Sequence, residues 1–210
     1  MTRISASILS FLFDAKLKKV PEHIMVDHIN SSLNEKKSNY QILHIDIEDG
    51  KFVNHRAFTP AQLRKIKVNC KTEAHLMVVN YDKYIRDYFH NADMFIIHNE
   101  VIKRTFPKTI AFLKKNKKFV GIAINPETHI DEIKYLDKVD MILVMSVHPG
   151  LPGQEFLEHS LNKIKKLAEL RKKNKYHYVI EVDGGINDSN AIKCMKAGAD
   201  ILVMGSHLFR

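Results

Sequence analysis

Residues 176–205, YHYVIEVDGGINDSNAIKCMKAGADILVMG, decide the fold of this chain. An apolar run, YVIEVD, leads through two glycines into an amphipathic segment, DSNAIKCMKA, and a second apolar run, ADILVMG, follows. Asn187 or Asp188 can cap the start of the predicted helix, and Gly198 supplies the left-handed residue that ends it. Two strands joined by a helix in this way are expected to lie parallel in one sheet.

The same alternation of short apolar runs and longer lysine-rich segments extends over the whole chain. Eight such runs predict an α/β fold, a closed (β/α)8 TIM barrel formed by a single domain of residues 1–210, because no linker divides the sequence. The last run ends only a few residues before Arg210, so we expect the helix after strand 8 to be short or absent. The eight runs are ISASIL (4–9), ILHID (42–46), TEAHLM (72–77), MFIIH (94–98), FVGIAI (119–124), MILVMS (141–146), YVIEVD (178–183) and ADILVMG (199–205).

The composition is typical of a globular protein that does not enter a membrane. Apolar residues make up 45% of the chain, and every apolar run is shorter than the roughly 18 residues that a membrane-spanning helix needs. The N-terminal segment lacks a cleavage pattern, and Cys70 and Cys194 lie far apart, so we expect a cytoplasmic protein with reduced thiols. The net charge of +9 comes from lysine clusters without interleaved aromatic residues, which favours a solvated surface over a nucleic-acid partner.

Imidazole and carboxylate side chains stand where several of the predicted strands end. His44 and Asp46 are two residues apart and therefore share a face of their strand, while His75 and Asp183 end two other strands. Taken singly, each is more often an ordinary polar or turn residue, but the carboxyl ends of barrel strands meet at one mouth. Together they predict a site for one divalent metal ion, Zn, Mn, Fe or Co, and two carboxylates that can move protons.

Glycine-rich segments follow the last three predicted strands. They are HPGLPGQ (148–154), DGG (183–185) and GSH (205–207). Each alone is a weak signal, but their succession gathers backbone amides without bulky side chains on one side of the barrel mouth. Barrels commonly hold phosphate at this place, so we expect an anionic, phosphorylated small molecule as the partner.

Five blocks of the sequence resemble the ribulose-phosphate 3-epimerase family in order and spacing. They are HIDIEDGKFV (44–53), AHLMV (74–78), GIAINPET (121–128), LVMSVHPGLPGQEF (143–156) and IEVDGGI (180–186). The resemblance implies an isomerase of the pentose phosphate pathway, which interconverts D-ribulose 5-phosphate and D-xylulose 5-phosphate through a metal-stabilised enediolate.

The resemblance also implies a role for individual residues. Asp46 and Asp183 would be the catalytic acid and base, and His44, Asp46, His75 and Asp183 the metal ligands. Met77 and Met145 would line the metal site, with Glu48 standing where the family usually has a methionine. Pro152 in the phosphate loop is a second departure, because proline lacks a backbone donor. The residues that would contact the substrate are Ser7, His75, Gly150, Leu151, Pro152, Gly153, Gly184, Gly185, Gly205 and Ser206.

Several alternatives stay open at this point. A 3-epimerase of a related ketohexose phosphate, such as allulose 6-phosphate, shares nearly all of these motifs, whereas a hexulose-phosphate synthase would need a lysine among the strand-end acids. A non-catalytic sugar-phosphate-binding barrel, inactivated by Glu48 or the loop changes, and a nucleic-acid-binding barrel recruited by the +9 charge are further hypotheses. The barrel seam left by the short final helix leads us to expect a homo-oligomer, a dimer or higher.

Overall fold

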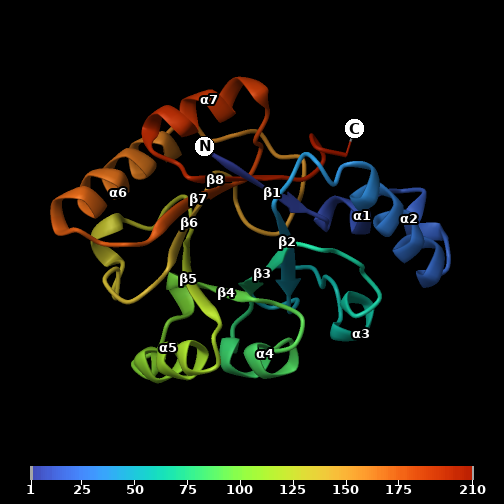
Figure 1. Ribbon diagram of the computed structural model, residues 1–210, viewed down its shortest axis with the longest axis horizontal. Coiled ribbons are helices and arrows are strands. Elements are labelled where there is room, and N and C mark those ends of the chain that lie inside the picture. The colour runs from blue at the N-terminus through green and yellow to red at the C-terminus, as the bar shows by residue number, and fades with distance from the viewer. Residues whose placement is uncertain (1, 210) are drawn as a thin grey trace.

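The computed structural model describes residues 2–209, which form a closed barrel of eight parallel strands in chain order (Figure 1). Each strand coincides with one of the eight predicted apolar runs, so the predicted TIM barrel is confirmed. The strands are β1 (Arg3–Ser7), β2 (Ile42–Glu48), β3 (Lys71–Met77), β4 (Met94–His98), β5 (Phe119–Ile124), β6 (Met141–Met145), β7 (Val179–Asp183) and β8 (Ile201–Met204).

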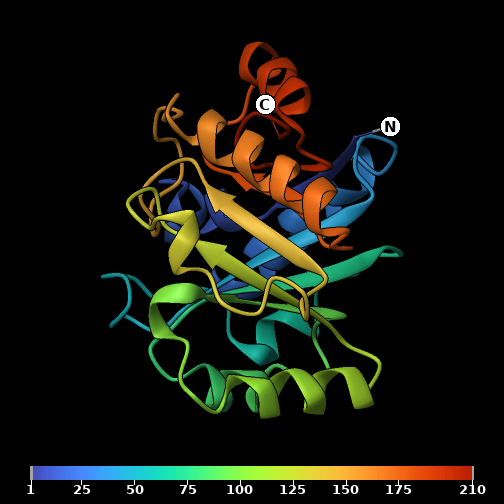
Figure 2. The same cartoon turned by 90° about the vertical axis from the view of Figure 1, so that its left-hand side faces the viewer.

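Helices surround the strands unevenly, as the two views in Figures 1 and 2 show. Only the short 3₁₀ helix η3 (Ile130–Glu132) lies between β5 and β6, and within residues 205–209 the chain turns after β8 without forming a helix. The remaining 3₁₀ helices are η1 (Leu17–Lys19) and η2 (Asn99–Val101). The α-helices are α1 (Leu9–Phe13), α2 (Glu22–Glu35), α3 (Pro60–Leu63), α4 (Tyr81–Asp87), α5 (Phe106–Lys115), α6 (Ser160–Asn174) and α7 (Asp188–Ala197).

The β7–α7–β8 unit has the capping that its sequence predicts. Asn187 is the N-cap of α7, and its side-chain oxygen accepts hydrogen bonds from the backbone amides of Ser189 and Asn190. Gly198 ends the helix in the left-handed conformation, with a φ of 116°. These two caps fix the length of the helix and therefore the place where β8 enters the barrel.

The barrel has two cores, because alternate residues of every strand point to opposite sides of the sheet. Outward-facing side chains such as Ile97 and Ile122 are fully buried between the strands and the helices. A second cluster lies inside the barrel and includes Ile96, Leu143 and Val203. Burying each such side chain stabilises the fold by about 1.5–3 kcal/mol.

The interior of the barrel is not apolar all round. The inward positions of β2, β3 and β7 carry His44, Glu73 and Glu181, all almost completely buried. Buried charged groups destabilise the fold unless they are paired or bind a ligand. A group of several such residues in one place therefore marks a functional site.

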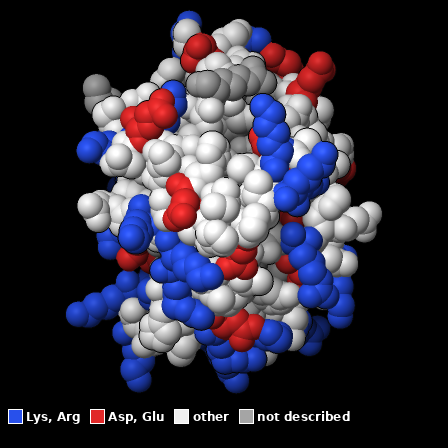
Figure 3. All heavy atoms as spheres, turned by 90° about the vertical axis from the view of Figure 1, so that its right-hand side faces the viewer, with Lys and Arg blue, Asp and Glu red and all other residues white. Residues whose placement is uncertain are grey.

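On the face shown in Figure 3, positively charged side chains are most numerous in the lower half and are interrupted by acidic ones. None of the helices within residues 2–209 is both long and apolar enough to cross a membrane.

Candidate active site

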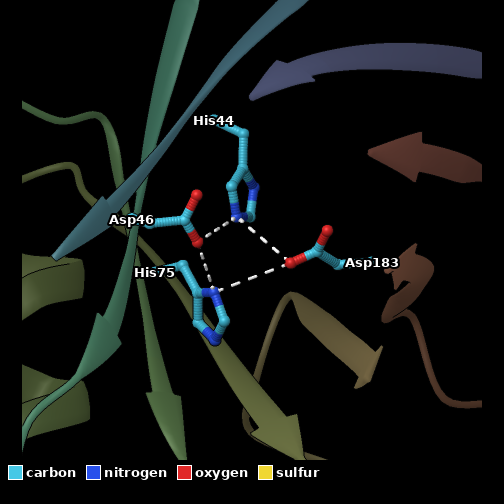
Figure 4. Close-up of side chains that lie close together, drawn as sticks. All are labelled: His44, Asp46, His75 and Asp183. Carbon is cyan, nitrogen blue, oxygen red and sulfur yellow. Dashed lines mark hydrogen bonds and ion pairs between the residues drawn. The ribbon is translucent and has the colours of Figure 1, made fainter. Parts of the chain in front are cut away.

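The four strand-end residues predicted from the sequence lie together at the carboxyl ends of β2, β3 and β7 (Figure 4). His75 Nδ1 lies 3.0 Å from Asp46 Oδ1 and 3.9 Å from Asp183 Oδ2. His44 Nε2 lies 3.4 Å from the same Asp46 oxygen and 3.8 Å from the same Asp183 oxygen. One nitrogen or oxygen atom from each side chain therefore faces a common centre.

Strand register explains why residues so far apart in the sequence meet. Asp46 of β2 stands opposite His75 of β3, and Asp183 of β7 stands opposite Met145 of β6. Because side chains two residues apart share a face, His44 points into the barrel one step below Asp46. Closure of the barrel then brings β7 round to β2 through β8 and β1.

The four side chains fit a divalent metal ion. His44 Nε2 is buried and has no hydrogen-bond partner anywhere in residues 2–209, although it faces two carboxylates. A metal held by four ligands at about 2.0–2.1 Å requires ligand atoms roughly 3.3 Å apart. The four separations between the histidine nitrogens and the aspartate oxygens range from 3.0 to 3.9 Å, and this range includes that value. Two imidazole nitrogens and two carboxylate oxygens suit Zn²⁺, Mn²⁺, Fe²⁺ or Co²⁺.

The two carboxylates differ in their proton affinity. Burial alone would raise the pKa of Asp46, but His44 and His75 beside it hold that pKa well below its usual value. Burial, opposed by His44 and assisted by the negative charge of Asp46, raises the pKa of Asp183 to about 7. Asp46 is thus held ionised, whereas Asp183 takes up a proton near neutral pH.

A cavity of about 360 Å³ opens beside this cluster and contains both carboxylates on its wall. Its size suits a small molecule. His75, also predicted to contact the substrate, is completely buried and is not among the residues that line the cavity. The other predicted contact residues all line it, and they are Ser7, Gly150, Leu151, Pro152, Gly153, Gly184, Gly185, Gly205 and Ser206.

The turn after β7 requires glycine at both of its central positions. Gly184 has a φ of 119°, and a Cβ atom there would lie 2.4 Å from Val147 Cγ2. Gly185 has a φ of 63°, and its Cβ would lie 2.6 Å from the backbone nitrogen of Phe156. The positive φ and the close packing both exclude larger residues, so the turn brings backbone rather than side chains to the cavity.

Met77, Met145 and Glu48 differ in how they relate to the cavity. The two methionines line it, whereas Glu48 does not. Glu48 is 5% exposed, and neither of its carboxylate oxygens accepts a hydrogen bond from the described part of the chain. Burial and the charge of Asp46 raise its pKa to about 8, and its oxygens lie outside the four-ligand cluster.

Two buried glutamates behind the cluster, Glu73 and Glu181, were not predicted from the sequence. Glu73 Oε1 lies 2.8 Å from His44 Nδ1 and accepts a hydrogen bond from the hydroxyl of Ser5. Glu181 is fully buried near Glu73, and burial together with the Glu73 charge raises its pKa well above the usual value. Glu73 and Glu181 stand two residues before His75 and Asp183, so strand alternation was the signal for both.

His98 was also missed, although it ends the predicted run MFIIH as His75 nearly ends its own run. Its ring is completely buried, and its Nε2 lies 2.8 Å from His75 Nε2. Burial lowers the pKa of His98 to about 4, so its imidazole is neutral. A histidine at a strand end, read together with its neighbours, could have pointed to this residue.

The barrel and the side chains at the carboxyl ends of its strands define a TIM-barrel enzyme. The chain belongs to the ribulose-phosphate 3-epimerase family, whose model matches residues 3–209. It is 34% identical to the ribulose-phosphate 3-epimerase of Helicobacter pylori strain J99, covering 92% of this chain and 91% of that protein. The expectation of an epimerase enzyme is thereby confirmed.

Two other relatives extend over the full length of this chain. The ribulose-phosphate 3-epimerase of Bacillus subtilis is 30% identical and is covered over 93% of its length. The enzyme of the same name from Methanocaldococcus jannaschii is 34% identical and is covered over 85% of its length.

Solved structures of low sequence identity share the fold. A 3-hexulose-6-phosphate synthase from Salmonella typhimurium superposes with a TM-score of 0.65 at 13% identity, over 98% of this chain and 90% of that one. A thiamine phosphate pyrophosphorylase from Pyrococcus furiosus gives 0.55 at 15% identity, over 97% and 85% of the two chains. At these identities the likeness shows the barrel fold alone.

Proposed function

We propose that this protein epimerises D-ribulose 5-phosphate at C3 to give D-xylulose 5-phosphate, in the pentose phosphate pathway. The observation that carries the proposal is the placement of Asp46 and Asp183, which approach the cluster from opposite sides in Figure 4 and line one cavity. Inversion at a carbon requires a proton to leave one face and another to arrive at the opposite face. Two carboxylates on either side of a bound substrate can perform both transfers.

Each carboxylate has a defined part in the proton transfers. Asp46 Oδ2 accepts a hydrogen bond from the Ser7 hydroxyl at 3.0 Å, which orients the ionised carboxylate as the base. Asp183, which lies opposite Asp46 in Figure 4 and lines the same cavity, serves as the acid that returns a proton to the other face. In the reverse reaction the two roles are exchanged, since the same path is followed in both directions.

One divalent metal ion would be held by His44, Asp46, His75 and Asp183. When bound, it supplies Lewis-acid stabilisation of the negative charge that develops on the substrate oxygens. The buried Nε2 of His44, which has no hydrogen-bond partner among residues 2–209, supports this assignment. The donor set suits Zn, Mn, Fe and Co alike, so the identity of the ion is left to measurement.

The phosphate would lie against the glycine turns after β6, β7 and β8. Gly150, Gly153, Gly184 and Gly185 all have positive φ, and they line the cavity together with Gly205 and Ser206. Backbone amides at such turns form concave sites for anions. The net charge of +9 would help to attract a dianionic substrate.

Three expectations about the protein as a whole stay predictions. We expect a cytoplasmic protein that consists of one domain and assembles into a dimer or higher homo-oligomer. Light scattering on the purified protein measures the last of these directly.

Turnover by the metal-reconstituted protein tests the proposed function. The purified protein is stripped with a chelator, loaded separately with Zn²⁺, Mn²⁺, Fe²⁺ and Co²⁺, and assayed for xylulose 5-phosphate. In D₂O, the C3 position of the product should carry deuterium, because the incoming proton derives from solvent through a carboxylate. Absence of turnover with all four ions would contradict the proposal and favour a barrel that binds sugar phosphate without reacting.

The preferred substrate is decided by a direct comparison. We expect a higher kcat/KM for ribulose 5-phosphate than for allulose 6-phosphate. A reversed ratio would move the assignment to the ketohexose phosphate while leaving the carboxylate roles intact.

A further inference from the structure

The ring of His98 lies directly behind His75, on the side away from the cavity. His75 presents Nδ1 to Asp46 and Asp183, and its other nitrogen, Nε2, lies 2.8 Å from Nε2 of His98. The centroids of the two rings are 4.9 Å apart, and the rings are nearly parallel, with an interplanar angle of 26°. The centroid of the Phe52 ring lies 4.5 Å from that of His98, so the His98 imidazole lies between the rings of His75 and Phe52.

A carboxylate completes the chain of contacts. His98 Nδ1 lies 3.1 Å from Glu100 Oε2. The other oxygen of Glu100 accepts hydrogen bonds from the backbone amide of Asn125, at 3.0 Å, and from the hydroxyl of Thr128. Glu100 is therefore anchored by the loop after β5 and cannot turn away from His98 without losing these bonds.

The chemistry of the contacts fixes the place of each proton. An imidazole that offers Nδ1 to a metal carries its proton on Nε2, so His75 must donate to His98. His98 Nε2 must then accept, which leaves the proton of that ring on Nδ1 for donation to Glu100. Each nitrogen has a single compatible role, and the chain ends on a carboxylate that accepts.

We propose that His98 and Glu100 are positioning residues that fix the tautomer and the ring orientation of His75, and through His75 the affinity of the site for its metal. This proposal rests on the proposed function, because it takes His75 to be a metal ligand. His44 provides the parallel case, since its Nδ1 contacts Glu73 directly at 2.8 Å. Partners of this kind behind a metal-bound histidine typically contribute about 10–100-fold to metal affinity.

The test measures metal affinity in the absence of substrate. Zn²⁺ binding to the chelator-stripped protein is measured by competition with a chromogenic chelator, and the visible spectrum of the Co²⁺-loaded protein reports ligand geometry. His98→Leu should weaken Zn²⁺ binding by about 10–100-fold and change the Co²⁺ spectrum. His98→Gln, which keeps an acceptor for the His75 proton, should recover most of the affinity.

Two further variants separate positioning from general stability. Thr109→Val, on α5 away from the site, removes a partly buried hydrogen bond to Asp82 that is 3.0 Å long. It should lower the unfolding temperature without changing Zn²⁺ affinity. Glu100→Ala should weaken Zn²⁺ binding about 3–30-fold. Because the Glu100 side chain is 26% exposed, this variant replaces His98→Leu as the test if His98→Leu does not fold.

The outcomes distinguish the two proposals. Wild-type Zn²⁺ affinity in both His98→Leu and Glu100→Ala, or an equal loss in Thr109→Val, would overturn the positioning role. If His98→Gln binds Zn²⁺ as weakly as His98→Leu, the acceptor on His98 is not what matters, and the proposal also fails. A wild-type protein that neither binds Zn²⁺ at one equivalent nor epimerises its substrate would instead contradict the proposed function.

Discussion

The two sides of the barrel mouth consist of different kinds of chemical group. On β2, β3 and β4 the site consists of buried side chains that contact one another, such as His44, His75 and His98. After β6, β7 and β8 the cavity wall consists largely of turns with glycines of positive φ, including Gly150 and Gly184. The first side offers ionisable groups, and the second offers mainly backbone, with Asp183 at the end of β7 as its contribution to the four-residue cluster.

This difference follows from what each side is proposed to bind. Metal binding and proton transfer need groups whose protonation is fixed by their neighbours, and burial among partners fixes it. An anion needs several donors at close range, and backbone amides provide them only where no side chain intervenes. The two sides should therefore respond to mutation in different ways.

The largest effect is expected at the two carboxylates, of which Asp46 lies on the ionisable side and Asp183 ends β7, next to the glycine turns. Asp46→Asn and Asp183→Asn each remove a proton-transferring group and should lower kcat by about 10²–10⁴-fold. Steady-state kinetics on metal-loaded protein, with metal content measured in parallel, checks this. Asp131→Asn, at a surface carboxylate on η3, is the control and should keep wild-type kcat. Near-normal turnover in either active-site variant would remove that residue from the reaction.

On the backbone side the expected cost is structural. Gly184→Ala combines a positive φ with a Cβ 2.4 Å from Val147, which together should cost about 2–4 kcal/mol of stability and lower Tm by roughly 5–15 °C. Gly153→Ala is the matched control, because its φ of 79° is positive but its Cβ would meet nothing within 4 Å among the described residues. Equal Tm values for the two variants would show that packing against Val147 does not limit this turn.

A lysine on α6 supports the ionisable side from a distance. Lys163 Nζ donates to the backbone carbonyls of Asn125, Pro126 and Thr128, at 2.6–2.8 Å, and this loop in turn holds Glu100. Lys163→Met should weaken Zn²⁺ binding about two- to fivefold, an effect smaller than that of any change to a residue nearer the metal. Chelator competition measures it, and Lys166→Met, which removes only an exposed ion pair, should leave the affinity unchanged.

A gain of similar size is expected on the backbone side. Pro152 lines the cavity but has no amide hydrogen, so Pro152→Ala adds one donor to the phosphate loop. One added hydrogen bond of about 0.5–1 kcal/mol should lower KM for ribulose 5-phosphate two- to fivefold. Leu151→Ala leaves the number of amides unchanged and should bring no such gain. An unaltered KM in Pro152→Ala would mean that this amide does not face the phosphate.

Much of this arrangement was available in the sequence. Eight short apolar runs gave the eight strands, and polar residues at strand ends identified His44, Asp46, His75 and Asp183 as neighbours. The glycine segments gave the cavity wall after β6 to β8. These features are local, because strand alternation and glycine conformations depend on only a few adjacent residues.

The sequence left other parts undecided. The sequence did not show that the connection between β5 and β6 contains only the short 3₁₀ helix η3. Glu73, Glu181 and His98 were not predicted, although strand alternation places the two glutamates on the same face as His75 and Asp183. The contacts that reveal a role, Glu73 with His44 and His98 with His75, join different strands. Glu48 shows the converse, since it lies beside Asp46 in the sequence pattern but outside the four-ligand cluster.

The sequence by itself determined the order of the strands, the ends at which their polar side chains stand, and the turns that must be glycine. Only the tertiary structure decided which of those side chains touch. The contact between His98 and His75, and the anchoring of Glu100 by Thr128, join separate strands and loops and depend on register and barrel closure. Hydrogen bonds act over about 3 Å, so a shift of one residue in register would abolish contacts that no local pattern encodes.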